Sequence, residues 1–322
     1  MRHGRLRLLR VLGLVAVLAL LVAACAEEEP VDEPEEPDEV EEPEEEPDEE
    51  EPDVAEPEGG PVTIGMVEWA ENIANTALWT EILEEEGYDV SVEVLDPGAV
   101  FAGVAQGDLD FFLDVWLPVT HADYIDDFGD DVHDLGLWYD GEAGLNMTVP
   151  EYVEEDAIPD LVGEGDKYDS TIVGIDAGSG LAQTTNEAVM PGYGLDDDGW
   201  THEESSEAAM LTELDSAIRD EEPVVVTLWT PHWAYAEYDL KVLEDPEGHY
   251  GDLEELSGIA REGLPDEDPV LVEWLENFMM TEDQLGELSG AVEEAEDAEG
   301  EREAAREWIE DNRDVVDEWL GR

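Results

Sequence analysis

The sequence predicts an α/β protein of two lobes with mainly parallel sheets, the second lobe being inserted into the first. Strand-like and helix-like segments alternate along the chain, which is the pattern of βαβ units that pair into parallel sheets. This alternation starts near residue 62 and again near residue 171, so each start is expected to build its own sheet. Ligands of such folds bind in the cleft between the lobes, against loops that leave the strand ends.

The first lobe follows from a βαβαβ pattern. Apolar residues with helical spacing cover 72–86 and stop at Gly87, and a second helix over 99–106 stops at Gly107. The strands expected around these helices are 62–67, 88–95 and 109–113.

The second lobe begins at a crossover after an expected strand that ends at Pro150, and the chain returns after Trp233. Lobe one is therefore expected to comprise 61–148 and 234–322, and lobe two 149–233. The remaining expected elements are strands 145–149, 171–175 and 223–229 and helices 181–190, 205–221, 269–280, 281–295 and 301–320.

Residues 1–25 are predicted to be a bacterial lipoprotein signal peptide. Four arginines precede an apolar stretch, 11–24, that is too short to span a bilayer comfortably. The small residues before Cys25 then form a lipobox, so Cys25 is expected to carry the lipid that anchors the protein on the extracytoplasmic face of the cell membrane. The alternative is an ordinary signal peptide with a chance cysteine. Because Cys25 is the only cysteine, no disulfide forms within the chain.

The rest of the chain is strongly acidic. Residues 26–60 hold 21 Asp and Glu with prolines at short intervals and no Lys or Arg, which predicts an extended, disordered linker. Without these acids and the four arginines of the signal peptide, residues 61–322 keep a net charge of −63. Such a surface argues against nucleic acid as a partner and suggests a halophilic protein that works in concentrated salt.

Three tryptophans stand where predicted strands end. Trp69 and Trp229 follow the first and last strands of the βα units, and Trp116 lies five residues before His121 on a loop that leaves a strand. Tryptophans from both lobes would form an aromatic box, and such boxes bind quaternary ammonium groups. The alternative is that all three are core residues.

The turn Asp176-Ala-Gly-Ser-Gly180 enters a predicted helix and therefore offers free backbone N–H groups to an anion. Its glycines do not have the spacing of a dinucleotide fingerprint, and it lacks the Gly-Lys-Ser/Thr of a P-loop.

Five segments resemble one known family, the glycine betaine/proline betaine-binding proteins of ABC osmolyte importers. The resemblance runs in colinear order over about residues 61–295. Its segments are Gly65-Met-Val-Glu-Trp69-Ala-Glu, Gly107-Asp-Leu-Asp-Phe-Phe-Leu-Asp-Val-Trp116-Leu-Pro-Val-Thr-His121, Gly174-Ile-Asp-Ala-Gly-Ser-Gly180-Leu, Ser206-Glu-Ala-Ala-Met-Leu and Pro223-Val-Val-Val-Thr-Leu-Trp-Thr-Pro-His-Trp233.

The resemblance implies a two-lobed, type II periplasmic-binding-protein fold with the ligand in the cleft between the lobes. It implies a cage of Trp69, Trp116 and Trp229 around the trimethylammonium group of the ligand. It also implies that His121 and the backbone amides of Gly180 and Leu181 hold the ligand carboxylate. The roles of His232, Trp233 and Tyr139 stay open, His232 being either a supporting residue beside the cage or a direct contact.

The expected function is therefore that of a receptor that captures glycine betaine and passes it to the permease of an ABC importer for osmoprotection, without a cofactor. Choline, carnitine or another betaine-like solute is the alternative ligand. The competing hypotheses are an enzyme, a metal receptor using His121, His133 and nearby acids, and a passive acidic envelope protein. The chain has no Gly-x-Ser-x-Gly and no His-Glu-x-x-His, which argues against the common hydrolase sites.

The net charge of −63 predicts that salt stabilises residues 61–322. The Debye length falls from about 10 Å at 0.1 M to about 3 Å at 1 M salt, so added salt removes most of the repulsion between surface acids. We expect the melting temperature to rise between about 0.1 M and 2 M NaCl or KCl. A melting temperature that stays flat or falls over this range would show that the acids only keep the protein soluble.

Overall fold

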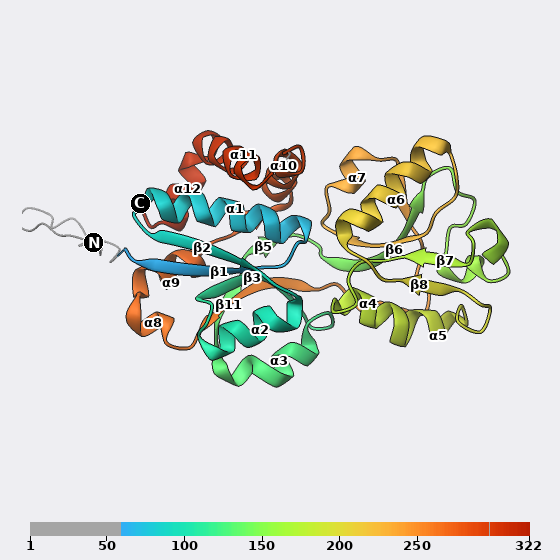
Figure 1. Ribbon diagram of the computed structural model, residues 1–322, viewed down its shortest axis with the longest axis horizontal. Coiled ribbons are helices and arrows are strands. Elements are labelled where there is room, and N and C mark those ends of the chain that lie inside the picture. The colour runs from blue at the N-terminus through green and yellow to red at the C-terminus, as the bar shows by residue number, and fades with distance from the viewer. Residues whose placement is uncertain (1–58, 296) are drawn as a thin grey trace, which may run out of the picture. The chain divides into compact units, whose positions relative to one another are not determined.

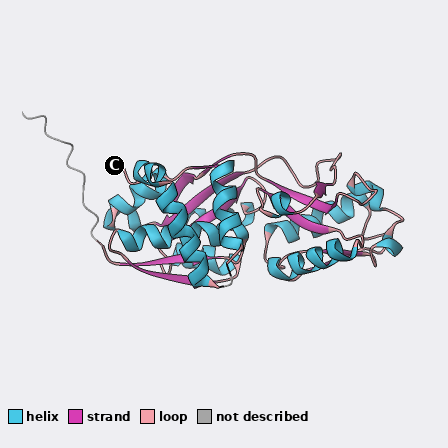
Figure 2. Cartoon of the chain, turned by 90° about the horizontal axis from the view of Figure 1, so that it is seen from above, coloured by secondary structure: helices cyan, strands magenta, loops and turns pink. Residues whose placement is uncertain are grey.

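The computed structural model describes residues 59–295 and 297–322. They form two five-stranded sheets with helices on both faces of each (Figure 1). Figure 2 shows the strands in two groups joined by loop segments. The predicted α/β architecture is therefore confirmed, whereas the predicted signal peptide, Cys25 and nearly all of the acidic linker lie outside the described residues.

The first sheet contains the βαβ core that the sequence predicts. Its strands lie in the order β2 (Asp89–Val94), β1 (Pro61–Met66), β3 (Phe111–Leu117), β11 (Glu255–Arg261) and β4 (Val132–Leu137). Strand β1 pairs in parallel with β2 and β3, and β11 runs antiparallel to β3 and β4. The central strand β3 is buried along nearly its whole length, because helices cover both faces of the sheet.

The first lobe is the group of elements around the first sheet, and its helices cover both faces of that sheet. Figure 1 shows α1 with α10 and α11 on one face of the sheet and α2 with α3 on the other. A small sheet of β5 (Tyr139–Asp140) and β12 (Met280–Thr281) lies beside them. The helices are α1 (Ala70–Glu85), α2 (Pro97–Gln106), α3 (Ala122–Phe128), α8 (Leu264–Glu267), α9 (Pro269–Asn277), α10 (Glu282–Glu293), α11 (Ala298–Asp311) and α12 (Arg313–Trp319).

The second lobe is the group of elements around the second sheet. Its strands lie in the order β10 (Leu240–Val242), β6 (Gly144–Pro150), β9 (Val226–Thr230), β7 (Thr171–Val173) and β8 (Thr201–Glu203). Strands β9, β7 and β8 are parallel, β6 pairs antiparallel with β9, and the edge strand β10 pairs antiparallel with β6. Its helices are α4 (Gly180–Thr184), a π-helical turn (Thr185–Val189), α5 (Met190–Tyr193), α6 (Glu207–Asp220) and α7 (Ala234–Glu237).

This sheet corrects the predicted lobe boundaries at residues 149 and 233. Strand β6 was expected to close lobe one, but it pairs with β9 along five residues and so belongs to lobe two. Strand β10, which follows the expected return, pairs with β6. The crossovers therefore lie before Gly144 and between β10 and β11. The prediction missed them because pairing with distant strands decides which lobe a strand belongs to, and local periodicity does not reveal that pairing.

Local sequence explains where the helices begin and end. Pro97 starts α2, and Gly107 ends it with a φ of +77°, a conformation that glycine adopts without strain. Thr281 and Gln284 form a capping box at the start of α10. The single helix predicted over 301–320 is instead broken at Asn312, whose side-chain amide donates to the carbonyl oxygen of Trp308 at 3.0 Å. Asparagine competes with helical backbone bonds in this way, so the chain turns into α12.

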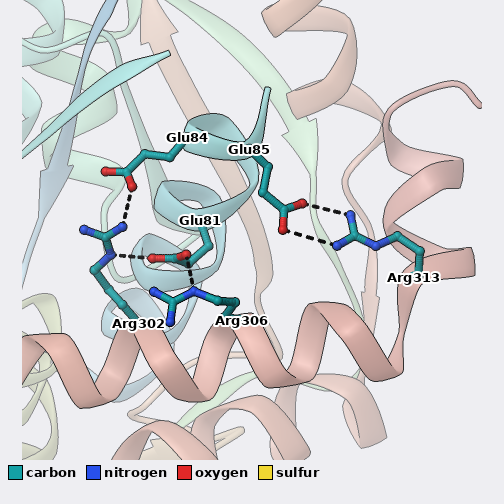
Figure 3. Close-up of polar contacts among 6 residues, drawn as sticks. All are labelled: Glu81, Glu84, Glu85, Arg302, Arg306 and Arg313. Carbon is teal, nitrogen blue, oxygen red and sulfur yellow. Dashed lines mark hydrogen bonds and ion pairs between the residues drawn. The ribbon is translucent and has the colours of Figure 1, made fainter. Parts of the chain in front are cut away.

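Ion pairs hold the C-terminal helices to α1 (Figure 3). Glu81 of α1 is buried, and its two oxygens accept hydrogen bonds from Nε of Arg302 at 2.5 Å and Nε of Arg306 at 2.9 Å. More exposed pairs flank this contact. They join Arg302 to Glu84, Arg313 to Glu85 and Arg322 to Glu86.

We expect Glu81→Gln to lower the free energy of unfolding by about 1–3 kcal/mol, because it removes the buried negative charge and turns an NH2 group toward one of the two guanidinium groups. The matched control is Glu85→Gln on the same helix, whose pair with Arg313 is exposed and should contribute less than about 1 kcal/mol. Urea unfolding at constant salt measures both. Equal losses of unfolding free energy in the two variants would show that the buried Glu81 pairs stabilise the protein no more than the exposed Glu85 pair does.

Candidate functional site

One pocket lies between the loops of the two lobes. The three predicted tryptophans, His121 and Leu181 all line it, whereas Gly180 lies directly beside it. The tryptophans are 3–5% exposed, so they are buried as a core would be, yet their rings face a shared space. The residues that line the pocket are Trp69, Glu71, Trp116, Thr120, His121, Leu145, Ile175, Ser179, Leu181 and Trp229.

Each of the three tryptophans donates its indole N–H to a carboxylate. A ring that is tethered at its N–H edge and packed in a buried site keeps one orientation. Two of these hydrogen bonds cross from one lobe to the other, and the third stays within strand β3. The pairs are Trp69 with Asp176 (3.0 Å), Trp229 with Glu71 (3.0 Å) and Trp116 with Asp114 (2.7 Å).

Carboxyl groups lie behind the rings of the pocket, and burial favours their neutral form. Burial raises the pKa of Glu71 to about 7, with a further contribution from the nearby Glu207. Burial and the charge of Glu71 also raise the pKa of Asp114 well above its usual range. A cation bound among the rings would favour the ionised form of both groups. Within the described part of the chain, no lysine or arginine lines the pocket.

His121 presents a neutral hydrogen-bond donor to the pocket. Its Nδ1 accepts the backbone N–H of Trp116 at 2.9 Å, so the neutral ring carries its proton on Nε2. Burial lowers the pKa of His121 to about 3, which keeps the ring neutral. Among the described residues Nε2 has no partner, and the ring stacks on Trp69 with centroids 5.8 Å apart. A buried donor without an acceptor is suited to a ligand oxygen.

The loop that carries His121 is fixed by Glu254. This buried carboxylate accepts the backbone N–H groups of Val119 at 2.9 Å and Thr120 at 2.8 Å, and the Thr120 hydroxyl donates to its second oxygen. Glu254 lies on the segment that returns from the second sheet to the first, so the crossover itself supports the site.

The start of α4 approaches this loop closely. Ser179 caps the helix by accepting the N–H of Ala182, and the amides of Gly180 and Leu181 belong to the first turn, where helical partners are missing. A Cβ at Gly180 would lie 2.0 Å from the carbonyl oxygen of Thr120. Only glycine therefore lets the backbone of the second lobe reach the loop that carries His121.

Of the residues with open roles, His232 contacts a residue that lines the pocket, and Trp233 and Tyr139 lie elsewhere. His232 packs edge-on against Trp229 at 4.8 Å, and Trp233 lines a second cleft of about 740 Å³. Tyr139 is buried in β5, and burial raises its pKa to about 12. His133, considered above with His121 for a metal site, pairs instead with Glu276 at 2.9 Å. Among the described residues, no group of three or more His, Cys, Asp and Glu side chains gathers as a metal site.

Sequence reasoning missed the carboxylates around the pocket. Asp114 lies two residues before Trp116 on the same strand, so spacing alone could have suggested it. Glu71 follows Trp69 closely, but its partner is Trp229, 158 residues away. Asp176 and Glu254 are separated from their partners by more than a hundred residues and left no such pattern.

Comparison with known proteins identifies the family of the chain. Residues 60–311 match the family OpuAC, described as the substrate binding domain of ABC-type glycine betaine transport systems. The chain belongs to this family. As an OpuAC-family protein it is a transporter substrate-binding protein rather than an enzyme.

Individual relatives agree with this membership. The glycine betaine/carnitine transport binding protein GbuC of Listeria monocytogenes is 42% identical over 177 residues, which span 55% of this chain and 56% of that protein. Lactococcal OpuAC, in a closed conformation with glycine betaine, is 31% identical with a TM-score of 0.74, covering 81% of this chain and 99% of that one. A choline binding protein in complex with choline is 25% identical with a TM-score of 0.73, covering 81% and 91%. These likenesses confirm the two-lobed, type II periplasmic-binding-protein fold.

A search of the described residues for membrane-spanning helices finds none with the necessary length and apolar character.

We expect Gly180→Ala to weaken the binding of glycine betaine by more than about tenfold, because the added methyl group pushes the start of α4 away from Thr120. Gly178→Ala is the matched control, since its Cβ would meet only ordinary contacts at 3.7 Å. Isothermal titration calorimetry measures both affinities. Wild-type affinity in Gly180→Ala would contradict the close approach seen here.

Proposed function

We propose that this protein captures glycine betaine, or a related quaternary ammonium osmolyte, in the tryptophan pocket and delivers it to the permease of an ABC importer. The observation that carries the proposal is that one pocket holds both aromatic ring faces, which attract a cation, and a hydrogen-bond donor, which binds an anion. Three ring faces lie with a neutral donor, His121 Nε2, that has no acceptor among the described residues.

The ring faces suit the cationic end of such a ligand. A trimethylammonium group has no N–H to donate, so oxygen acceptors cannot hydrogen-bond to it. The faces of Trp69, Trp116 and Trp229 supply negative potential without needing a donor, at about 0.5–2 kcal/mol per contact depending on desolvation. The carboxylates on the indole N–H groups add negative charge behind the rings.

The opposite end of the ligand is a carboxylate, which needs donors. His121 Nε2 and the first-turn amides of Gly180 and Leu181 are the donors we assign to it. A neutral histidine is adequate here, since a zwitterion brings its own positive charge to the carboxylates around the rings.

Choline is the alternative ligand, together with carnitine. The choline binding protein that resembles this chain binds a quaternary ammonium compound without a carboxylate. The donor set around His121 favours glycine betaine, because choline would leave these donors unpaired.

Substrate-binding proteins of ABC importers work on the extracytoplasmic side of the membrane. We further propose that a lipid on Cys25 anchors this protein there and that residues 26–60 form the spacer. Support comes from the lipobox and from the acidic, proline-interrupted composition of the linker.

We expect each of Trp69→Ala, Trp116→Ala and Trp229→Ala to weaken glycine betaine binding by more than about tenfold, the equivalent of roughly 1.4 kcal/mol. Each change removes one ring face from the cation. Trp308→Phe on α11, far along the chain from the pocket residues, is the control for the loss of a buried tryptophan. Calorimetric titration decides it, and undiminished affinity in all three alanine variants would exclude the cage.

We expect choline to bind more weakly than glycine betaine, and His121→Phe to remove most of this difference. Phenylalanine keeps a ring against Trp69 but has no N–H, so glycine betaine should lose about tenfold or more while choline changes little. Choline is the internal control, because any damage to the cage weakens both ligands alike. Equal affinity of the two solutes for the wild-type protein would show that the carboxylate site is misassigned.

A further inference from the structure

The N-terminus of α1 in lobe one is capped by a side chain from lobe two. The carboxylate of Glu207, the first residue of α6, accepts the backbone N–H of Ala70 at 3.1 Å. Trp69 at the N-cap position provides no side-chain acceptor of its own. The first amides of a helix have no intrahelical partner and favour a nearby negative charge, so Glu207 satisfies α1 across the cleft.

His232 holds the other oxygen of Glu207. Its Nδ1 accepts the N–H of Ala234 at 3.0 Å, so the neutral ring carries its proton on Nε2, which donates to Glu207 Oε1 at 3.1 Å. The His232 side chain is fully buried, and burial lowers its pKa to about 4, which keeps it neutral. The same ring packs edge-on against Trp229. Glu207 is thus fixed by two N–H donors, one from each lobe.

Ala70 lies between two residues of the pocket. Trp69 precedes it and donates its indole N–H to Asp176, while Glu71 follows it and accepts the indole N–H of Trp229. A carboxylate that fixes the peptide N–H of Ala70 therefore fixes the backbone from which both contacts arise.

We propose that Glu207 and His232 are positioning residues of the ligand site, forming a clasp that holds the start of α1 against the second lobe when the lobes are together. The inference rests on the proposed function and deepens it. Neither residue lines the tryptophan pocket, so both act on the ligand through the backbone of α1 and through Trp229. Because release requires the lobes to separate, the clasp should slow dissociation and leave association unchanged.

The clasp also couples to the charge state of the pocket. The titratable groups that face Glu71 are Glu207 of α6, His232 after β9 and Asp114 of β3. Glu207 is in turn faced by Asp176 after β7 and by Glu293 of α10, and Glu293 also faces His232. Because burial raises the pKa of Glu207 to about 8 and that of Glu71 to about 7, a cationic ligand should bind more tightly as pH rises through this range. Removing the charge of Glu207 should move this rise to lower pH.

Two variants separate the clasp from the local fold. Glu207→Gln keeps the size of the side chain but turns an NH2 group toward one of the two donors. His232→Asn removes the contact with Glu207, while its side-chain oxygen can still accept the N–H of Ala234 two residues on. Glu213→Gln, an exposed carboxylate of the same helix, is the matched control.

The experiment is stopped-flow tryptophan fluorescence of the purified protein with glycine betaine, together with calorimetric affinities from pH 6 to 9. We expect dissociation to become about tenfold faster in Glu207→Gln and in His232→Asn, with association within about twofold of wild type. The double variant should be no worse than the worse single variant, and the pH midpoint should fall in Glu207→Gln. Glu213→Gln should match wild type in every measurement.

Wild-type dissociation rates and an unmoved pH midpoint would overturn the clasp while glycine betaine binding itself remained intact. If Glu207→Gln fails to fold by its thermal melt, the dissociation rate of His232→Asn alone decides, since that variant keeps the turn at Ala234. A wild-type protein that binds no quaternary ammonium solute would overturn the proposed function and this inference with it.

Discussion

Three buried indole N–H groups each need a hydrogen-bond acceptor, and this requirement organises the centre of the molecule. A buried donor left unpaired costs about 1–3 kcal/mol. The acceptors are carboxylates, and two of them come from the opposite lobe, Asp176 for Trp69 and Glu71 for Trp229. Two of the three bonds that orient the rings therefore also join the lobes, so the orientation of Trp69 and Trp229 is tied to the contact between the lobes.

Carboxylates in such a place create a second constraint, because buried negative charge needs a counter-charge. The described part of the chain offers little positive charge for this purpose. All eight basic residues of 61–322 form ion pairs with other acids, and none of them lines the pocket. Three of the eight attach α11 and α12 to α1 (Figure 3), and the C-terminal Arg322 pairs with Glu86 at the end of α1. The raised pKa of Glu71 is the sign of this shortage. A ligand with a fixed positive charge would supply this missing counter-charge.

The tryptophans of the pocket could be predicted, whereas the carboxylates that pair with them from the opposite lobe could not. Trp116 follows an apolar strand and precedes His121 by five residues, which is a local pattern. Asp176 lies 107 residues from Trp69, and Glu71 lies 158 residues from Trp229, in a chain where acids occur everywhere. Composition cannot single out one acid among so many.

The same limit applies to strand β6. Its apolar residues predicted a strand correctly, but its pairing with β9 decided which lobe it belongs to. Gly180 was predicted for its amide, but only the structure reveals that the Thr120 carbonyl excludes a side chain there.

The acidic surface and the acidic pocket act over different distances. At about 1 M salt the Debye length is about 3 Å, so the field of exposed acids fades before it reaches a buried site. The carboxyl groups of Glu71 and Asp114 lie in hydrogen-bond contact with the indoles of the pocket, and both groups are buried. Their attraction for a cation is therefore screened far less than that of the surface. A glycine betaine ligand is neutral overall, so the surface field neither attracts nor repels it strongly. The same chain can thus carry a surface that depends on salt and a binding site that does not.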